Sequence, residues 1–352
     1  MSFKYWSKYI LLITILFFII IASFNYIINP YSIFTHKLFS TFLKTKDHIV
    51  SERMLTFYTA EKVKPNNLMV GSSRIGLFSK SEIEKYLSGT TFNMAMPGSN
   101  IEEQTQYMKY MINNYEIKNI IWGLDFYSFN PDLQNDSDFS YNRLNPTLFL
   151  RNDFKIALLS LQTTKNSFKT LKDNLLINNN KVKTKKVIIS IIKSTKKKKS
   201  TNPPLIVLSK EQIIQKTNDL LESYTKKYFN SNKFKNPESI LINIKKMKDI
   251  INLCEQKNVK LYIYTSPVQI KFINLYTKLG LKNTFQKWKI ELSNITQYTD
   301  FCYSNSVTNN LYNFMDGSHI MPTYGEKIFS KVFNDTKINT SSDFGKTIDK
   351  KN

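Results

Sequence analysis

The chain of 352 residues has only two cysteines and three histidines. Cys254 and Cys302 cannot supply a disulfide framework or a cysteine-rich metal site. Both lie in apolar segments, and we expect them to be small buried side chains. The sequence also contains no His-rich metal spacing, no phosphate-binding glycine loop and no Gly-x-Ser-x-Gly elbow. We therefore expect neither a metal nor a cofactor.

Arginine is equally scarce, although the chain is strongly basic. The formal charge is +23, from 50 Lys and Arg against 27 Asp and Glu, and the whole set of arginines is Arg53, Arg74, Arg143 and Arg151. Nucleic-acid readers use Arg for bidentate contacts, so we expect no nucleic-acid partner. The lysine excess is typical of an AT-rich coding bias or of an anionic neighbour. The run Lys196–Lys199 fits a solvated loop, or a contact with an acidic polymer or lipid headgroups.

Charge is absent from Tyr9 to Ile28, where nearly every residue is apolar. A run of about 20 such residues matches the thickness of the hydrocarbon core. It is longer than the apolar core of a signal peptide, and no small-x-small cleavage site follows it. Lys4 and Lys8 precede it, which favours a cytoplasmic N-terminus. The sequence predicts an uncleaved single-pass anchor in the cell membrane, with the rest of the chain extracytoplasmic.

The remaining organisation is predicted from alternating apolar and helix-like segments. We expect an anchor over 1–30, a connector over 31–65, an α/β domain over 66–335 and a polar tail over 336–352. A helical and basic stretch at about 131–237 interrupts the rhythm and is interpreted as an insertion or a helical cap over the site. Expected strands lie at 68–70, 91–96, 118–126, 259–265 and 301–303, and one long helical region at 271–295. Such alternation predicts a mainly parallel sheet with helices on both faces, in a three-layer sandwich.

Two short strings follow this pattern at opposite ends of the domain. Gly71-Ser72-Ser73-Arg74 comes directly after a strand, and Asp316-Gly317-Ser318-His319 lies near the C-terminus. A serine becomes a nucleophile when a histidine takes its proton and an acid orients that histidine. His36 and His48 lie in no chemical pattern, so His319 is the candidate base and Asp316 the candidate acid. Ser73 is the preferred nucleophile and Ser72 the alternative; an ordinary turn with a solvated histidine is the non-catalytic interpretation.

With two further blocks, the chain resembles the SGNH (GDSL-like) hydrolase and acyltransferase superfamily. These blocks are the run 93–100, which contains Gly98, and Gly123-Leu124-Asp125. The resemblance is to the membrane-anchored, envelope-facing branch, which includes DltD-type D-alanyl transfer proteins and polysaccharide O-acetylation proteins. It implies a flavodoxin-like α/β sandwich, a triad of Ser73, His319 and Asp316, and an oxyanion hole made by the amides of Ser73 and Gly98.

Asp125 departs from the asparagine that the third block of this superfamily carries. An asparagine donates to the developing oxyanion, whereas an ionised aspartate repels it. Asp125 therefore organises the loop, binds substrate, is protonated, or is replaced as donor by a residue such as Asn100; we favour the structural or substrate-binding role. Arg74 is expected to pair with a nearby carboxylate or to contact an anionic substrate.

The expected function is that of a serine esterase or O-acyltransferase in a bacterial cell envelope. The resemblance implies an envelope polysaccharide or teichoic-acid-like polymer as substrate and a membrane-bound O-acyltransferase as a protein partner. The alternative is a non-catalytic protein of the same fold that binds or assembles polymer. An anchored lipase that faces the cytoplasm is the third hypothesis.

Overall fold

The computed structural model describes residues 3–34, 52–145, 149–175 and 210–351. The chain divides into two compact units. The first contains Met1–Lys62 and Ser140–Ile206, and the second contains Val63–Phe139 and Val207–Asn352. His36, His48 and the run Lys196–Lys199 lie outside the described residues.

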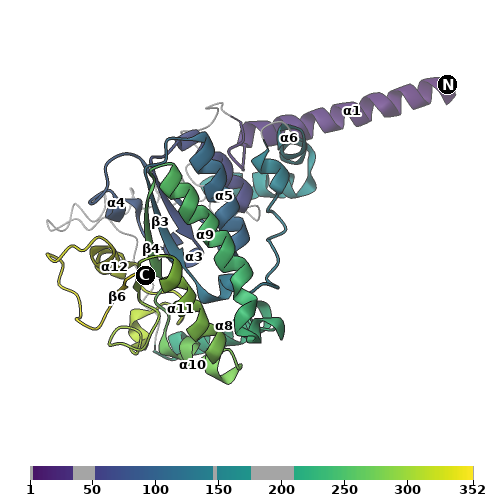
Figure 1. Cartoon of the computed structure of the whole chain (residues 1–352). Coiled ribbons are helices and arrows are strands. Elements are labelled where there is room, and N and C mark those ends of the chain that lie inside the picture. The colour runs from purple at the N-terminus through teal and green to yellow at the C-terminus, as the bar shows by residue number, and fades with distance from the viewer. Residues whose placement is uncertain (1–2, 35–51, 146–148, 176–209, 352) are drawn as a thin grey trace, which may run out of the picture. The chain divides into compact units, whose positions relative to one another are not determined.

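The second unit is built on a sheet (Figure 1). The sheet has six strands in the order β2-β1-β3-β4-β5-β6. The strands are β1 (Asn67–Gly71), β2 (Thr91–Ala95), β3 (Asn119–Leu124), β4 (Lys260–Thr265), β5 (Tyr298–Asp300) and β6 (Lys346–Ile348). The pairings among β1 to β5 are parallel, and β6 is antiparallel to β5. The first five strands have the order of flavodoxin-like sheets, in which the direction of winding reverses between β1 and β3. The prediction of an α/β fold with a mainly parallel sheet is confirmed.

Helices connect these strands and cover them. The α-helices of this unit are α3 (Ser73–Gly76), α4 (Lys80–Ile83), α5 (Ile101–Asn114), α8 (Lys210–Tyr228), α9 (Leu241–Gln256), α10 (Ile270–Lys278), α11 (Lys282–Ile295) and α12 (Gly325–Val332). Short 3-10 helices lie at Phe126–Phe129, Lys233–Lys235, Pro237–Ile240, Leu311–Asn313 and Pro322–Tyr324. α5 packs against α9, α9 against β4, and α12 against β4 and β5. Every residue of β1 and β3 is buried, as expected of central parallel strands.

Two predicted elements of this unit are wrong. The expected helix over 271–295 is two helices, because the chain turns at Gly280, which has a φ of +73°. The expected strand over 301–303 is displaced, since β5 ends at Asp300. The backbone N–H groups of Phe301 and Cys302 donate to Oγ1 of Thr265 at 3.0 and 3.2 Å, so a side chain holds them and not a strand ladder.

The expected polar tail over 336–352 is also corrected, because it contributes to the sheet. Its residues Lys346–Ile348 form β6 at the edge. Phe344 is fully buried in the same apolar cluster as Met69 and Ile121 of the central strands. The α/β unit therefore extends beyond residue 335.

The first unit is helical. It contains α1 (Phe3–Ile28), α2 (Glu52–Val63), a 3-10 turn at Tyr141–Leu144, α6 (Phe149–Leu159) and a further helix over residues 161–175. Part of the expected connector is thus the helix α2. The segment from Tyr5 to Ile28 is long and apolar enough to cross a membrane, and only 6% of its most apolar window is buried. In the rest of the unit Arg143 forms a buried ion pair with Asp153 at 2.8 Å.

Candidate active site

The backbone presents Ser73 at the point where β1 ends and α3 begins. Gly71, the last residue of β1, has a φ of +148°, and a Cβ there would lie 2.5 Å from the carbonyl oxygen of Gly123 in the neighbouring strand. Ser72 then caps α3, since its Oγ accepts a hydrogen bond from the amide of Arg74 at 3.2 Å. Ser73 is the first residue of α3 and is partly exposed. Only glycine at position 71 permits this close turn.

The turn from Asp316 to His319 presents the histidine from the other end of the chain. Asp316 Oδ1 accepts hydrogen bonds from the amides of Ser318 and His319 at 3.0 and 2.9 Å. Gly317 lies between them with a φ of +78°, which favours glycine. The Asp316 side chain thereby closes the turn that carries its partner, as Asx-turns do.

The structure brings Ser73, His319 and Asp316 together. Ser73 Oγ lies 2.8 Å from His319 Nε2, although 246 residues separate them. His319 Nδ1 lies 2.8 Å from Asp316 Oδ2 and 3.0 Å from Oδ1. An Nδ1–H that donates to the carboxylate leaves Nε2 free to accept the serine proton. Ser72, the alternative nucleophile, is buried and occupied as the cap of α3.

The charge of Asp316 is stabilised in this arrangement. Burial alone would raise the pKa of its carboxyl group, but hydrogen bonds from the His319 ring and from the two amides lower it below 3.8. The carboxylate is therefore ionised at neutral pH and attracts an imidazolium at His319. The His319 and Asp316 side chains are 18% and 25% exposed, so solvent reaches the site.

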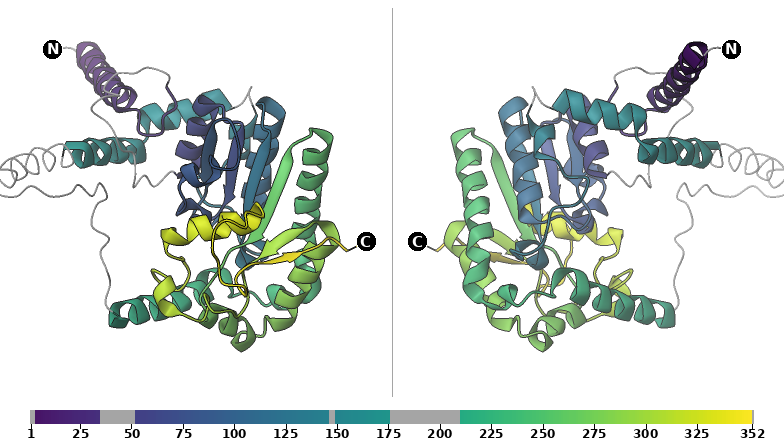
Figure 2. Two further views of the ribbon diagram at one scale, coloured as in Figure 1. Left: turned by 90° about the vertical axis from the view of Figure 1, so that its left-hand side faces the viewer. Right: turned by 90° about the vertical axis from the view of Figure 1, so that its right-hand side faces the viewer.

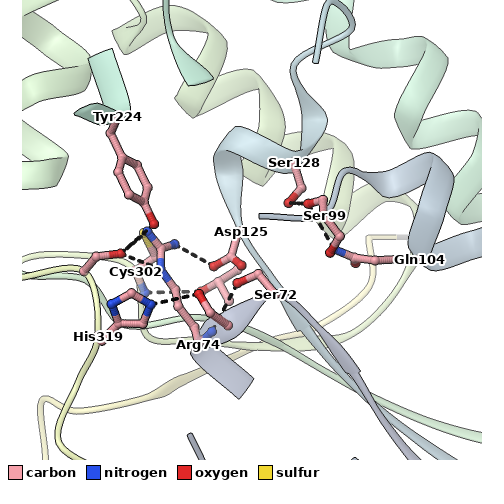
Figure 3. A network of polar contacts seen from close by, with 12 residues as sticks. Ser72, Arg74, Ser99, Gln104, Asp125, Ser128, Tyr224, Cys302 and His319 are labelled. Carbon is pink, nitrogen blue, oxygen red and sulfur yellow. Dashed lines mark hydrogen bonds and ion pairs between the residues drawn. The ribbon is translucent and has the colours of Figure 1, made fainter. Parts of the chain in front are cut away.

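A buried network beneath these residues joins the two strings (Figure 3). Arg74 Nη1 donates to Asp125 Oδ1 at 2.6 Å, and its Nε and Nη2 donate to Ser318 Oγ at 3.2 and 3.0 Å. Ser318 Oγ also lies 2.9 Å from Tyr224 Oη. The guanidinium carbon lies 5.4 Å from the ring centroid of Tyr127. Because Arg74 follows the serine and Ser318 precedes the histidine, the network connects both halves of the triad.

Electrostatics favour a charged pair at the centre of this network. The Arg74 and Asp125 side chains are 5% and 0% exposed. Burial alone would lower the pKa of Arg74, but the neighbouring carboxylate of Asp125 raises it well above its usual value. Asp125 thus acts as an acceptor inside the protein. Its other oxygen, Oδ2, is buried and has no hydrogen-bond partner within the described residues.

Asn100, the other side chain expected near the oxyanion, is also engaged elsewhere. Its Oδ1 accepts from the amide of Glu103 at 2.9 Å and caps α5. Its Nδ2 donates to the carbonyl of Leu133 and to the side chain of Asn135 at 2.8 and 2.9 Å. Neither Asp125 nor Asn100 therefore presents a free side-chain donor at the site.

Gly98 lies in a loop that is fixed by hydrogen bonds to the next residue, Ser99. Ser128 Oγ donates to the carbonyl of Ser99 at 2.8 Å, and Gln104 Nε2 donates to Ser99 Oγ at 2.9 Å (Figure 3). Gly98 itself has a φ of +66°, and a Cβ there would lie 2.6 Å from Tyr228 Oη. Within the described residues, the backbone N–H groups of Ser73 and Gly98 have no hydrogen-bond partner. Both amides are available to an oxyanion.

The helix α8 packs beside the site. In both views of Figure 2 it lies next to the yellow C-terminal segment that carries the histidine. Tyr224 contacts Ser318, Tyr228 approaches Gly98, and Thr217 lies against Gly317. The expected insertion is thus split between the two units, and its α8 part packs against the site. Sequence reasoning missed these residues; their spacing of seven and four along one helical face is the signal that could have indicated a shared contact.

The described part of the chain offers little support for a metal site or a reactive cysteine. There, no group of three or more His, Cys, Asp or Glu side chains is arranged to hold a metal. Cys254 and Cys302 are free and buried, and burial raises the pKa of each thiol to about 12, so neither is a thiolate at neutral pH. A surface hollow of about 380 Å³ between α5 and α9 contains no residue of the triad. The candidate site is therefore identified by the hydrogen bonds among Ser73, His319 and Asp316, and not by the volume of a surface hollow.

Comparison with known proteins adds no relative. No protein-family model matches the chain, and no curated protein is significantly similar to it. The geometry of the site and the motifs of the sequence are therefore the features that indicate a function.

Proposed function

We propose that the chain is a membrane-anchored serine esterase or O-acyltransferase with an SGNH-type three-layer α/β sandwich. The observation that carries the proposal is the continuous hydrogen-bonded series from Ser73 Oγ through the His319 ring to the Asp316 carboxylate, with distances of 2.8 Å at each step. Nucleophile, base and orienting acid at such distances form the arrangement that acyl transfer requires. The position of Ser73 at the carboxyl end of β1, beside the switch in strand order, is typical of a ligand site in such sheets.

The reaction starts with attack of Ser73 Oγ on the carbonyl carbon of an acyl ester. His319 Nε2 takes the serine proton, and Asp316 stabilises the imidazolium. The oxyanion accepts hydrogen bonds from the amides of Ser73 and Gly98. Collapse of the tetrahedral intermediate breaks the ester bond, and the leaving alkoxide takes the proton from His319. Water or a sugar hydroxyl, deprotonated by His319, then attacks the carbonyl carbon of the acyl-Ser73 ester. Its bond to Ser73 Oγ breaks, His319 returns the proton to Oγ, and the acyl group leaves on the acceptor.

The anchor and the charge support an acceptor in the cell envelope. α1 is long and apolar enough to cross a membrane, and Lys4 and Lys8 favour a cytoplasmic N-terminus, so we propose an extracytoplasmic catalytic unit. The net charge of +23 suits an acidic polysaccharide or a teichoic-acid-like polymer. A membrane-bound O-acyltransferase is the proposed source of acyl groups.

Labelling of the full-length chain in detergent with a fluorophosphonate probe tests the chemistry. We expect one adduct, on Ser73, and hydrolysis of a chromogenic acetyl ester. Ser73→Ala and His319→Ala should abolish turnover, and Asp316→Ala should lose less, because in a serine protease the first two losses cost on the order of 10⁶ in kcat and the third roughly 10⁴. Ser72→Ala is the matched control and should keep both activities. Unchanged ester turnover in folded Ser73→Ala would refute the proposal.

A second candidate is a protein of the same fold that binds polymer without catalysis. The observation that favours it is Asp125, which lies in a buried ion pair and offers no side-chain donor to an oxyanion. It predicts that the folded wild-type chain reacts with no fluorophosphonate and hydrolyses no acyl ester, while it retains acidic polymer in a sedimentation assay. Stoichiometric labelling of Ser73 would eliminate this candidate.

A further inference from the structure

The helix over residues 161–175 in the first unit buries polar side chains and exposes a stripe of apolar ones, which is unusual for a helix of a soluble protein. Its buried side chains are all polar: Thr163, Asn166, Ser167, Thr170 and Asn174. Its most exposed apolar side chains are Leu161, Phe168 and Leu175, at 78%, 61% and 45%. These three are seven residues apart, about two helical turns, so they form one stripe along the helix.

The polar face of this helix packs on the C-terminal end of α1. Asn25 of α1 is fully buried; its Nδ2 donates to Thr164 Oγ1 at 3.0 Å, and its Oδ1 accepts from Ser167 Oγ at 2.9 Å. Asn166 Nδ2 donates to Tyr31 Oη, just beyond α1, at 2.9 Å. Side-chain hydrogen bonds between Asn, Ser and Thr on neighbouring helices are typical of helix contacts in a lipid environment.

The apolar stripe is continuous with the exposed surface of α1. Side chains from Tyr5 to Ile20 along α1 are all exposed. Where that run ends, the ring of Phe24 lies 4.7 Å from the ring of Phe168. The middle residue of the stripe therefore contacts α1 near the C-terminal end of the segment that is able to cross a membrane.

Positive charge on α6 and on the helix over 161–175 complements a membrane surface. Lys155 of α6 and Lys165, Lys169 and Lys172 of the helix over 161–175 are exposed. Lysines beside an apolar stripe are typical of helices that lie in the headgroup region, where anionic lipids attract them. The part of this helix over 161–175 therefore combines an apolar stripe with basic side chains, as helices that lie along a bilayer do.

We propose that the helix over 161–175 lies in the bilayer interface beside α1, with Leu161, Phe168 and Leu175 among the acyl chains and its lysines at anionic headgroups. The lipid bilayer is the occupant of the stripe because the stripe continues the exposed surface of α1 and carries basic flanks. The inference goes beyond the proposed reaction, and it depends only on the proposed insertion of α1. Its role is to hold the first unit against the membrane by a second contact.

Spin labelling of the full-length chain in phosphatidylcholine and phosphatidylglycerol vesicles tests this. Labels at Leu161→Cys, Phe168→Cys and Leu175→Cys should collide with oxygen, which concentrates in lipid, and be protected from a water-soluble nickel chelate. Ile242→Cys is the matched control, because it is an exposed apolar position of the second unit at 56%. Leu12→Cys, 65% exposed on α1, is the lipid reference. The unsubstituted chain measures background labelling of its two buried cysteines.

The expected result is an oxygen-to-nickel collision ratio at the stripe severalfold above that at Ile242 and approaching that at Leu12. A ratio at the stripe equal to that at Ile242 would show a water-exposed face and overturn the inference. Low collision rates with both reagents would show that a protein covers the stripe, which also overturns it. If Leu12 itself gives the water-exposed ratio, the insertion of α1 fails together with this inference, while Ser73 labelling still tests the proposed chemistry independently.

Discussion

Asp125→Asn is the substitution that best separates a structural role of Asp125 from a role at the oxyanion. In the structure the carboxylate is fully buried and lies 2.6 Å from Arg74 Nη1. Asparagine keeps the shape of the side chain but removes its charge. Removal of one partner of a buried ion pair typically costs about 3–5 kcal/mol, because the other charge stays buried without compensation. The amide oxygen still accepts a hydrogen bond from Arg74, so we expect the lower end, about 3 kcal/mol.

The assay is thermal unfolding of the full-length chain in detergent, followed by near-ultraviolet circular dichroism. The second unit has about 220 residues, and a loss of about 3 kcal/mol lowers the Tm of a domain of that size by roughly 6–12 °C. Fluorophosphonate labelling of Ser73 should slow as well, since Arg74 also donates to Ser318, which precedes His319. Stability and activity should fall together.

The double variant Arg74→Gln with Asp125→Asn is the control for charge. It removes both charges, so part of the stability lost in Asp125→Asn should return, with a coupling energy of about 1–3 kcal/mol. An unchanged Tm in Asp125→Asn together with faster labelling of Ser73 would refute the reasoning. That outcome would mean that position 125 faces the oxyanion and that the asparagine supplies the missing donor.

Two further predictions concern Gly98 and the pH dependence of stability. Gly98→Ala should slow Ser73 labelling and should destabilise the second unit by more than the about 1–2 kcal/mol typical of a non-glycine residue in the left-handed region, because its Cβ would lie 2.6 Å from Tyr228 Oη. The matched control is Gly280→Ala, since Gly280 has a φ of +73° and its Cβ would have no atom within 4 Å. The control should lower the Tm only by the cost of the backbone conformation. The pKa of Asp316 is lowered in the folded chain, so its contribution to stability is present above pH 3.8 and is lost as the pH falls through the folded pKa. The difference in Tm between wild type and Asp316→Asn should therefore shrink in acid. A constant difference in Tm from pH 7 to pH 2 would contradict this prediction.

Much of the second unit could be predicted because its signals are local. The strands β1 and β3 are short apolar runs that are fully buried, and such runs identify central parallel strands. Serine at the end of one strand and histidine in a turn closed by its own aspartate are also local patterns. Ser73 could be placed at the carboxyl edge of the sheet because it follows β1, and its contact with His319 was expected from the order of the motifs in the resemblance.

The features that sequence reasoning missed depend on tertiary contacts. Phe301 and Cys302 are apolar and buried, yet Thr265 holds their amides, so composition alone misplaced the strand. β6 is short and polar, and only its pairing with β5 makes it a strand. The contact of Tyr224 with Ser318 joins residues 94 positions apart. The local sequence of α8 gives no indication that Tyr224 contacts Ser318.

The ion pair of Arg74 with Asp125 explains why each of these two charged residues is buried. An aspartate where the resemblance implies asparagine is unfavourable at an oxyanion if it faces the substrate. Here β1 and β3 are neighbours, with Val70 opposite Trp122, so the residues that follow the two strands meet at the same edge of the sheet. Because the arginine that follows Ser73 is buried, an anion beside it becomes necessary. The aspartate is then explained by its neighbouring arginine, and the proposed oxyanion donors are the backbone amides of Ser73 and Gly98 alone.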